Sequence, residues 1–443
     1  MQETKQFSIN YPLSMSHFSF TLGAMYEVDT LSSGLPVLTA TAKGADSVTV
    51  LVFAGAGSRY EEESERGISH FLEHMFFKGG KKYASTKEVS MAIDGRGGDF
   101  NAFTGKEYAG YYVKVAAEHT ELACDVLSDM LLHAAFPQEE IEKERGVIIE
   151  EERMYQDTPM YRAGWDFEEL LFGNHPLGWD TIGQEKVILR VKQNDFQLHK
   201  ESFYTPDNCV AVFAGNIDHS RSMELSQQFF GAMHGAKKRE FLPLESYGAE
   251  KVFLRSKKTE QSHLVLGVPS VSALDADHCA AKLLAIILGG NMSSRMFLNI
   301  REAKGLCYYI SSDTDSYLDA GSLSTRAGVD QSRLHEAISL IVQEYLTCAK
   351  EGILEDELQR AKDFLRGKFT LSLEDSEERA HFFGKQKLLY PNMFDTDAYL
   401  QKFDAVTKEQ VNVLAARLLT AENFRLVVIG KEDNAGALEK LIG

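Results

Sequence analysis

The chain has 443 residues, of which 44% are hydrophobic and 25% are charged. This composition is typical of a globular protein, and the length exceeds what one hydrophobic core usually serves, so we expect two domains. No apolar run approaches the roughly 18 residues of a membrane-spanning helix. The formal net charge of −18 disfavours a nucleic-acid partner. It is compatible with basic peptide substrates, although such a charge more often only keeps a protein in solution.

The beginning of the sequence lacks the patterns of a targeting segment. Residues 1–8, MQETKQFS, contain no charged stretch followed by an apolar one, as a secretion signal would. They also lack the arginine-rich, acid-poor composition of an organelle transit peptide. We therefore expect a cytoplasmic location.

The first half of the chain alternates between strand and helix patterns. Residues 48–54 are β-branched and apolar and predict a buried strand, which a glycine-rich turn ends. A helix is expected from about Gly67 to Gly79. The later elements are, in chain order, strands at 99–104 and 108–115, helices at 118–133 and 138–155, a mixed segment around 173–178, a helical stretch to about 203, a strand at 208–215 and a helix to about 231.

A similar series follows a candidate linker at 231–248, which contains a charge cluster and Pro243. The final strand, NFRLVVIG at 423–430, repeats the Asn-to-Gly spacing of NCVAVFAG at 208–215. We interpret the chain as a divergent internal duplication of one α/β unit. The expected elements of the second copy are a strand at 262–267, a helix at 276–288, strands at 306–312 and 321–327, long helices at 331–349 and 355–373, and the final strand.

Residues 69–76, Ser-His-Phe-Leu-Glu-His-Met-Phe, hold a candidate metal site. His70, Glu73 and His74 share one side of the predicted helix, because residues three and four apart are neighbours on a helix surface. The order H-x-x-E-H inverts the H-E-x-x-H order of zincins and is a signature of zinc peptidases. Its chemistry needs His70 and His74 as neutral imidazole ligands and Glu73 as the base that deprotonates the attacking water. The alternative is a pair of surface histidines on an amphipathic helix.

The second half lacks this motif, since no further H-x-x-E-H occurs in the sequence. If the glycine pairs at 79–80 and 289–290 correspond, Ala280, Leu283 and Leu284 stand where the first half carries the motif. We therefore expect one zinc ion per chain.

A catalytic zinc site with two histidines needs a third protein ligand. Glu144 and Glu151 would share one face of the helix at 138–155, because seven residues make nearly two turns. Glu150 and Glu152 would point about 100° to either side of Glu151. A ligand with a supporting carboxylate behind it would show such a pair, but most glutamates here are expected to be solvated charges. The candidates on this helix are Glu139, Glu140, Glu142, Glu144, Glu150, Glu151 and Glu152.

The motif and the glutamate-rich helix together resemble the pitrilysin, insulysin and mitochondrial processing peptidase family of inverted zincins. In that family H-x-x-E-H is followed by a glutamate after 76 intervening residues, and the same number separates His74 from Glu151 here. The resemblance implies that His70, His74 and Glu151 bind zinc. It also implies that Glu73 is the general base and that Glu144 orients a ligand from behind.

Two further stretches resemble the same family. REAKGLCY, from Arg301 to Tyr308, matches the family's R-E-x-x-G-L-x-Y stretch, whose Arg and Tyr reach across to the zinc site and hold the substrate or the oxyanion. GDFNAFT at 98–104 resembles the edge strand on which the family binds substrate by β-addition, with Asn101 and Ala102 as the expected contacts. Without the resemblance, Arg301 would be a surface residue and Tyr308 a packing residue.

The resemblance covers about residues 25–430 and implies an α+β fold. We expect two homologous domains, each a mainly antiparallel sheet backed by helices, which together form half of a clamshell. The sequence predicts an N-terminal catalytic domain at 1–230, a linker at 231–248, and a C-terminal domain at 249–443 that has no metal site and supplies the Arg–Tyr pair.

The implied activity is that of a zinc-dependent endopeptidase that cleaves peptides or unfolded segments in an enclosed chamber. We expect a homodimer, because one chain keeps both the zinc motif and the Arg301–Tyr308 pair; a heterodimer with a related chain is the alternative. Two other classes stay open. One is a non-catalytic assembly subunit, and the other is a peptide-binding module without turnover.

Overall fold

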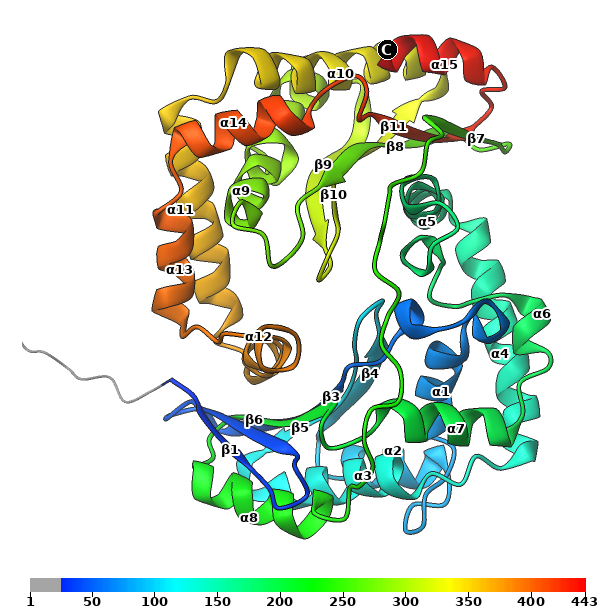
Figure 1. The fold of residues 1–443 in the computed structure, drawn as a ribbon, viewed down its shortest axis with the longest axis vertical. Helices are drawn as coiled ribbons and strands as arrows, with labels where there is room; N and C mark the ends of the chain where they lie inside the picture. Colours follow the sequence, from blue (N-terminus) through cyan, green and yellow to red (C-terminus); the bar gives the residue numbers. More distant parts are fainter. Residues whose placement is uncertain (1–24) are drawn as a thin grey trace, which may run out of the picture.

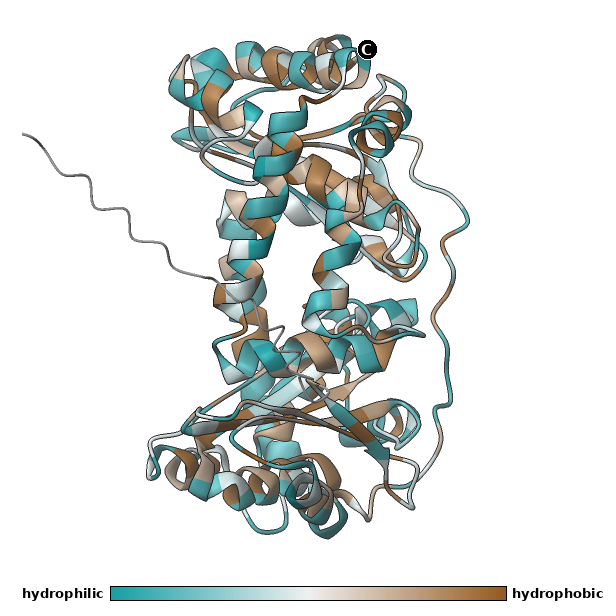
Figure 2. Ribbon diagram, turned by 90° about the vertical axis from the view of Figure 1, so that its left-hand side faces the viewer, coloured by the Kyte–Doolittle hydropathy of each residue, from teal (hydrophilic) through white to brown (hydrophobic). Residues whose placement is uncertain are grey.

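The computed structural model describes residues 25–443, so the segment at 1–8 lies outside the described residues. Each half of the chain is built on one β-sheet that helices cover (Figure 1). The helices are banded with polar and apolar residues (Figure 2), as expected for elements that bury one face. The fold is therefore α+β with two sheet-based halves, as predicted.

The first sheet has six strands in the order β1-β2-β6-β3-β5-β4. β2 and β6 are parallel and the other neighbours are antiparallel. β4 therefore lies at an edge of this sheet. The strands are β1 (Glu27–Thr30), β2 (Pro36–Thr41), β3 (Ser47–Ala54), β4 (Asp99–Thr104), β5 (Ala109–Ala116) and β6 (Cys209–Gly215).

Seven helices share one apolar core with this sheet, among them the short helix α6 (Glu185–Ile188) through Val187 and Ile188. The core contains the apolar sides of β3, β5 and β6, whose alternating residues face the helices. The other six helices are α1 (Ile68–Phe76), α2 (Thr86–Asp94), α3 (Thr120–His133), α4 (Gln138–Asp157), α7 (Gln193–Phe203) and α8 (His219–Phe230).

The second sheet has five strands in the order β7-β11-β8-β10-β9. Its strands are β7 (Val252–Ser256), β8 (Gln261–Ser270), β9 (Cys307–Ser316), β10 (Gly321–Asp330) and β11 (Arg425–Gly430). A separate apolar core joins it to its helices. These helices are α9 (His278–Gly289), α10 (Leu334–Glu351), α11 (Glu355–Ser372), α13 (Thr396–Asp404), α14 (Lys408–Leu418) and α15 (Ala435–Ile442).

The two sheets confirm the internal duplication. β7, β11, β8, β10 and β9 take the places of β2, β6, β3, β5 and β4, and each sheet contains one parallel pair, β2 with β6 and β7 with β11. α9 follows β8 as α1 follows β3. Ala280, Leu283 and Leu284 of α9 are buried in the second core.

Two helices exchange partners between the halves. α5 (Pro159–Phe172) precedes the connection between the halves but packs on β8 and β11 of the second sheet. Phe167 and Leu171 of this helix meet Val265 and Val427 there. α12 (Ser376–Leu389) belongs to the second half but packs on β2, β3 and β6 of the first sheet (Figure 1). The halves are therefore interlocked.

The sequence patterns did not predict α5 or α12, and within α12 only Glu378 is exposed, so no polar face marks it as a surface helix. Between α8 and β7, a stretch the structure describes throughout, the chain contains no helix or strand and runs as an extended connection along one side of the molecule (Figures 1 and 2). Within residues 25–443 we find no helix with the length and apolar character that crossing a membrane requires.

Candidate metal centre

α1 turns the three polar residues of its motif away from the core. His70, Glu73 and His74 are half-buried. The helix begins after Gly67, whose φ of 97° is in the left-handed region, and a Cβ there would lie 2.2 Å from the carbonyl oxygen of Ile182. Only glycine suits this position. The opposite face of α1 is buried through Ile68, Phe71, Leu72, Met75 and Phe76.

A carboxylate from an earlier turn caps this helix. Glu61 accepts hydrogen bonds from the backbone N–H groups of Gly67 and Ser69, each at 2.8 Å. Such bonds satisfy N–H groups that a helix leaves free in its first turn. Burial raises the pKa of Glu61 to about 7 despite these two hydrogen bonds. Glu61 therefore fixes the start of α1, and no local sequence pattern predicts this role.

The structure brings His70 and His74 together with Glu151 of α4. One donor atom from each lies within 4.8 Å of the other two, and no other group of three metal-binding side chains was found among the described residues. The Nε2 atoms of His70 and His74 lie 3.8 Å and 3.6 Å from Glu151 Oε2.

The neighbouring glutamates of α4 have other partners. Glu150 is exposed and pairs with Arg153 at 2.5 Å, and Glu152 accepts a hydrogen bond from Gln156 at 2.9 Å. Of the three adjacent candidates, Glu151 alone joins the histidines.

Glu144 lies behind the histidine pair. Its carboxylate accepts a hydrogen bond from His74 Nδ1 at 2.8 Å and forms an ion pair with Lys78 at 2.5 Å. Burial acts to raise the pKa of Glu144, but the bonds from His74 and Lys78 outweigh it and hold this pKa below its usual value. A carboxylate that holds Nδ1–H leaves the Nε2 lone pair free for a metal.

The donor set fits a zinc ion. Zinc binds two imidazole nitrogens and a carboxylate oxygen in many catalytic sites. Burial, and then the charge of His74, lowers the pKa of His70 to about 3, so its imidazole is neutral at physiological pH. Neutral imidazole is the form that binds a metal.

Glu73 points to the end of the edge strand. Thr104 Oγ1, on the last residue of β4, donates to Glu73 Oε2 at 2.5 Å. Burial raises the pKa of Glu73, while the Thr104 hydrogen bond and the charge of His74 act against it. No sequence pattern indicates this role of Thr104, because its partner lies thirty-one positions away.

Asn101 and Ala102 occupy the middle of β4. Asn101 pairs with Tyr112 and Ala102 with Tyr111 of β5, so β4 uses one of its two edges within the sheet. No described strand covers the other edge. A free edge can accept an extended peptide as an added strand.

Arg301 and Tyr308 lie in the second half and are not brought to the metal-binding cluster. Arg301 belongs to η5 (Phe297–Glu302), where its guanidinium lies 4.6 Å from the centroid of the Phe297 ring. Tyr308, on the edge strand β9, is 77% exposed. Among the described residues, neither side chain hydrogen-bonds to the histidine–glutamate cluster.

A buried arginine joins the two halves, and it belongs to none of the sequence motifs. Arg59 is 1% exposed and pairs with Glu107, which follows β4, and with Asp319 between β9 and β10, the latter at 2.5 Å. Glu107 also accepts a hydrogen bond from the backbone N–H of Leu318 at 3.0 Å. These contacts fix the loop after β4 against the second half.

Within residues 25–443, the duplicated α+β fold holds one cluster of two histidines and a glutamate, which is the arrangement of two-domain inverted-zincin folds. One family model, described as insulinase (peptidase family M16), matches residues 36–181, and a second, described as the peptidase M16 inactive domain, matches residues 190–365. The chain belongs to the peptidase M16 (insulinase) family, as the sequence predicted.

Named relatives and solved structures agree with this assignment. The chain is 36% identical to the "Uncharacterized zinc protease YmxG" of Bacillus subtilis over 91% of its length and 98% of the relative. The structure of a protease from Helicobacter pylori is similar with a TM-score of 0.83 at 21% identity, over 91% of this chain and 99% of that one. A peptidase M16 inactive domain structure from Pseudomonas fluorescens gives a TM-score of 0.85 at 18% identity, over 92% and 98%. At these identities the two structures show the shared fold alone.

Proposed function

We propose that the protein is a zinc-dependent endopeptidase that cleaves peptides or unfolded segments. The observation that carries the proposal is that donor atoms of His70, His74 and Glu151 lie within 4.8 Å of one another. A further carboxylate, that of Glu73, lies on α1 with the two histidines. The zinc-protease names of its relatives support the same activity.

His70, His74 and Glu151 would hold the zinc ion, and Glu144 would keep His74 in the ligating tautomer. When bound, zinc supplies Lewis acidity, which polarises a carbonyl group and lowers the pKa of water. The remaining steps belong to side chains of this protein.

Glu73 is the general base of the proposed reaction. Its carboxylate accepts a proton from the water that attacks the scissile carbonyl and then delivers that proton to the leaving amine. Burial, which raises its pKa, suits a group that must both take and give a proton near neutral pH. The hydrogen bond from Thr104 holds the carboxylate in place between the two transfers.

The substrate would bind as an added strand along β4, with Asn101 and Ala102 as its main contacts. Tyr308 and Arg301 would stabilise the oxyanion and hold the peptide. Because both lie apart from the metal-binding cluster in the described structure, this role requires the second half to move toward the first when substrate binds.

We also propose an enclosed chamber formed by two copies of the chain. This assembly would admit flexible peptides and exclude folded proteins. Light scattering of the active protein tests it, because a monomeric mass at full activity would contradict the dimer.

Glu73→Gln tests the central assignment. The amide keeps the size of the side chain but cannot accept the proton, so the variant should keep one zinc ion per chain and lose cleavage of a quenched fluorescent peptide. Glu150→Gln is the matched control, because Glu150 is exposed on α4 and pairs only with Arg153. Substantial cleavage by Glu73→Gln would refute the base, and absence of zinc from the unaltered protein would refute the metal centre.

A further inference from the structure

Two adjoining cavities lie between the halves of the molecule. The larger, of about 360 Å³, extends from Gly105 and Trp165 to Lys385. The smaller, of about 190 Å³, lies between α9 and α12 and is called the α9–α12 cavity below. The two share four lining residues, Thr314, Ser316, Lys385 and Tyr390.

Two residues that line the larger cavity adjoin residues beside the metal-binding cluster. Gly105 follows Thr104, which donates to the proposed base Glu73. Trp165 packs on Tyr155 with ring centroids 4.8 Å apart, and Tyr155 lies one turn after Glu151 on α4. The larger cavity therefore lies between the end of β4 and the α9–α12 cavity.

The α9–α12 cavity is cationic. Lys282 and Lys385 line it beside His278, and no aspartate or glutamate does. Within residues 25–443, neither lysine takes part in a salt bridge, and His278 Nδ1 is buried without a hydrogen-bond partner. The other lining residues are Thr314, Ser316, Phe382, Gln386, Tyr390 and Tyr399, most of which carry hydrogen-bonding groups.

Nearby charges add to this character. Burial lowers the pKa of His278 to about 4, and the charges of Lys282, Lys402 and Lys385 act in the same direction, against the opposing effect of Asp275. Lys385 is also close to the Tyr108 ring, with its Nζ 4.9 Å from the ring centroid. Ammonium groups from α9, α12 and α13, those of Lys282, Lys385 and Lys402, are therefore close enough to His278 to lower its pKa.

Two of the three acidic residues that line the larger cavity form ion pairs with cationic side chains. Glu168 pairs with Lys106 at 2.9 Å, and Glu107 pairs with Arg59. Asp315 is buried, which raises its pKa. A chain with a net charge of −18 repels acidic ligands over most of its surface, so unpaired lysines in an internal cavity stand out.

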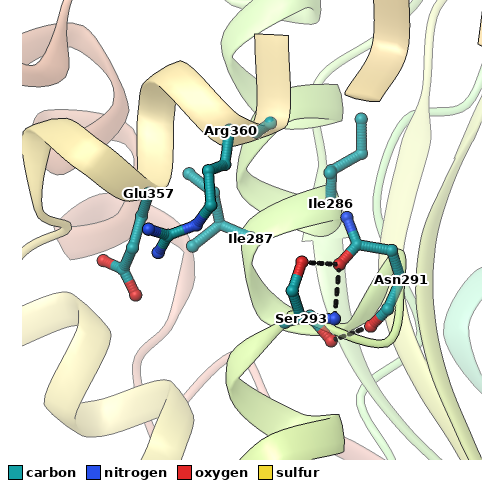
Figure 3. Close-up of a pocket in the computed structure, with 8 residues that line it drawn as sticks. Ile286, Ile287, Asn291, Ser293, Glu357 and Arg360 are labelled. Atoms are coloured by element: carbon teal, nitrogen blue, oxygen red, sulfur yellow. Dashed lines mark hydrogen bonds between the residues drawn. The ribbon is translucent and has the colours of Figure 1, made fainter. Parts of the chain in front are cut away.

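A small cavity beside α9 offers no comparable site. It measures about 20 Å³, room for about one water molecule. Figure 3 shows that the side chain of Asn291 at its rim already accepts hydrogen bonds from the backbone N–H and the hydroxyl of Ser293, at 2.9 Å and 2.8 Å.

We propose that the α9–α12 cavity binds a carboxylate of the peptide substrate, at some residues' distance from the scissile bond. The inference rests on the proposed peptidase function. Carboxylates are the anionic groups that an unmodified peptide carries, and Lys282 and Lys385 supply the matching donors. The bound carboxylate belongs either to an acidic side chain or to the C-terminus of the peptide. In the first case a glutamate peptide is preferred over its glutamine counterpart, and in the second a free-acid peptide is preferred over its amide.

The test uses quenched fluorescent peptides and the zinc-loaded full chain. One neutral sequence carries a single glutamate at each position in turn, with a glutamine counterpart for each, and one further pair ends in a free acid or an amide. We expect kcat/KM to favour the carboxylate about ten-fold in one pair, the size of one charge-assisted hydrogen bond. Lys282→Gln and Lys385→Gln should each reduce this ratio, and the double variant should abolish it.

The matched control is Lys87→Gln, because Lys87 is exposed on α2 outside both cavities. It should keep the ratio, and its kcat/KM for the glutamine peptides should match that of the unaltered protein. A ratio near one for every pair, or a ratio that survives in the double variant, overturns the inference. Thermal unfolding checks each variant, and Lys282→Gln alone decides the question if the double variant does not fold.

Failure of the proposed function gives a different result. If the unaltered protein cleaves no peptide, that function is refuted, and fluorescence anisotropy then measures binding of the same pairs. If the unaltered protein binds the carboxylate peptide preferentially and Lys282→Gln and Lys385→Gln lose this preference, the result supports carboxylate binding in the cavity without catalysis. Equal binding of both members of every pair, or no binding, refutes it.

Discussion

Replacing Glu144 by alanine removes the carboxylate that holds His74. The hydrogen bond to His74 Nδ1, at 2.8 Å, is the contact that orients the proposed ligand. Loss of such a supporting carboxylate lowers metal affinity by about 10- to 100-fold, which corresponds to about 1.4 to 2.8 kcal/mol. This range matches the value of one hydrogen bond to a charged group, about 1.5 to 3 kcal/mol.

The same change also breaks the ion pair with Lys78, so stability and zinc affinity must be separated. Lys78→Met removes the ion pair but leaves the His74 contact, and it should lower the free energy of unfolding while zinc affinity stays nearly constant. Competition with a chromophoric chelator at neutral pH gives the Kd for zinc, and urea unfolding gives the stability. Glu150→Ala is the control on the exposed side of α4. A Kd for Glu144→Ala within about two-fold of the control would refute the orienting role, since one lost charge-assisted bond predicts more.

Three other changes test the surroundings of the site. Thr104→Val keeps the side-chain shape but removes the hydrogen bond to Glu73, so kcat should fall about ten-fold at unchanged zinc content; an unchanged kcat would contradict the positioning role. Arg59→Met leaves the buried carboxylate of Glu107 without its charge partner and should lower the free energy of unfolding in urea by about 3 to 5 kcal/mol, and a loss below about 1 kcal/mol would show that the Arg59 pairs do not join the halves. Burial, and then the charge of Arg239, lowers the pKa of His199 from 6.5 to about 3, so below pH 6.5 the unfolded state takes up a proton that the folded state resists. The contribution of neutral His199 to stability is complete above pH 6.5 and is lost as the pH falls toward 3. Between pH 6.5 and about pH 5, the free energy of unfolding of His199→Gln should therefore fall by about 2 kcal/mol less than that of the unaltered protein. Parallel plots of the free energy of unfolding against pH for the two proteins would contradict the assignment.

The sequence predicts the parts of the site that depend on local pattern. β3, α1 and α4 have strong periodicity, and the helical repeat alone puts Glu144 and Glu151 on one face. The choice of Glu151 over its neighbours came from the family resemblance, and the structure now brings this residue to the histidines.

Other contacts could not be predicted because they join residues without a shared pattern. Glu61 caps α1 from outside the helix, and Thr104 reaches Glu73 from a strand. Arg59 meets a partner 260 positions away. α5 is amphipathic and α12 is covered on nearly all sides, but only the three-dimensional arrangement shows that each packs on the sheet of the other half. Tertiary contacts of this kind leave no trace in residue spacing.

The second half shows which residues the fold requires in α9, the helix that follows β8. α9 fills the positions equivalent to the motif with Ala280, Leu283 and Leu284, all buried in an apolar core. The same architecture is therefore stable without imidazoles or carboxylates at these positions. In α1 the polar groups are held where burial opposes their charged forms, as the lowered pKa of His70 and the raised pKa of Glu73 record. Because the fold does not need this arrangement and its burial is unfavourable, the cluster is better accounted for by a bound ion than by a structural role.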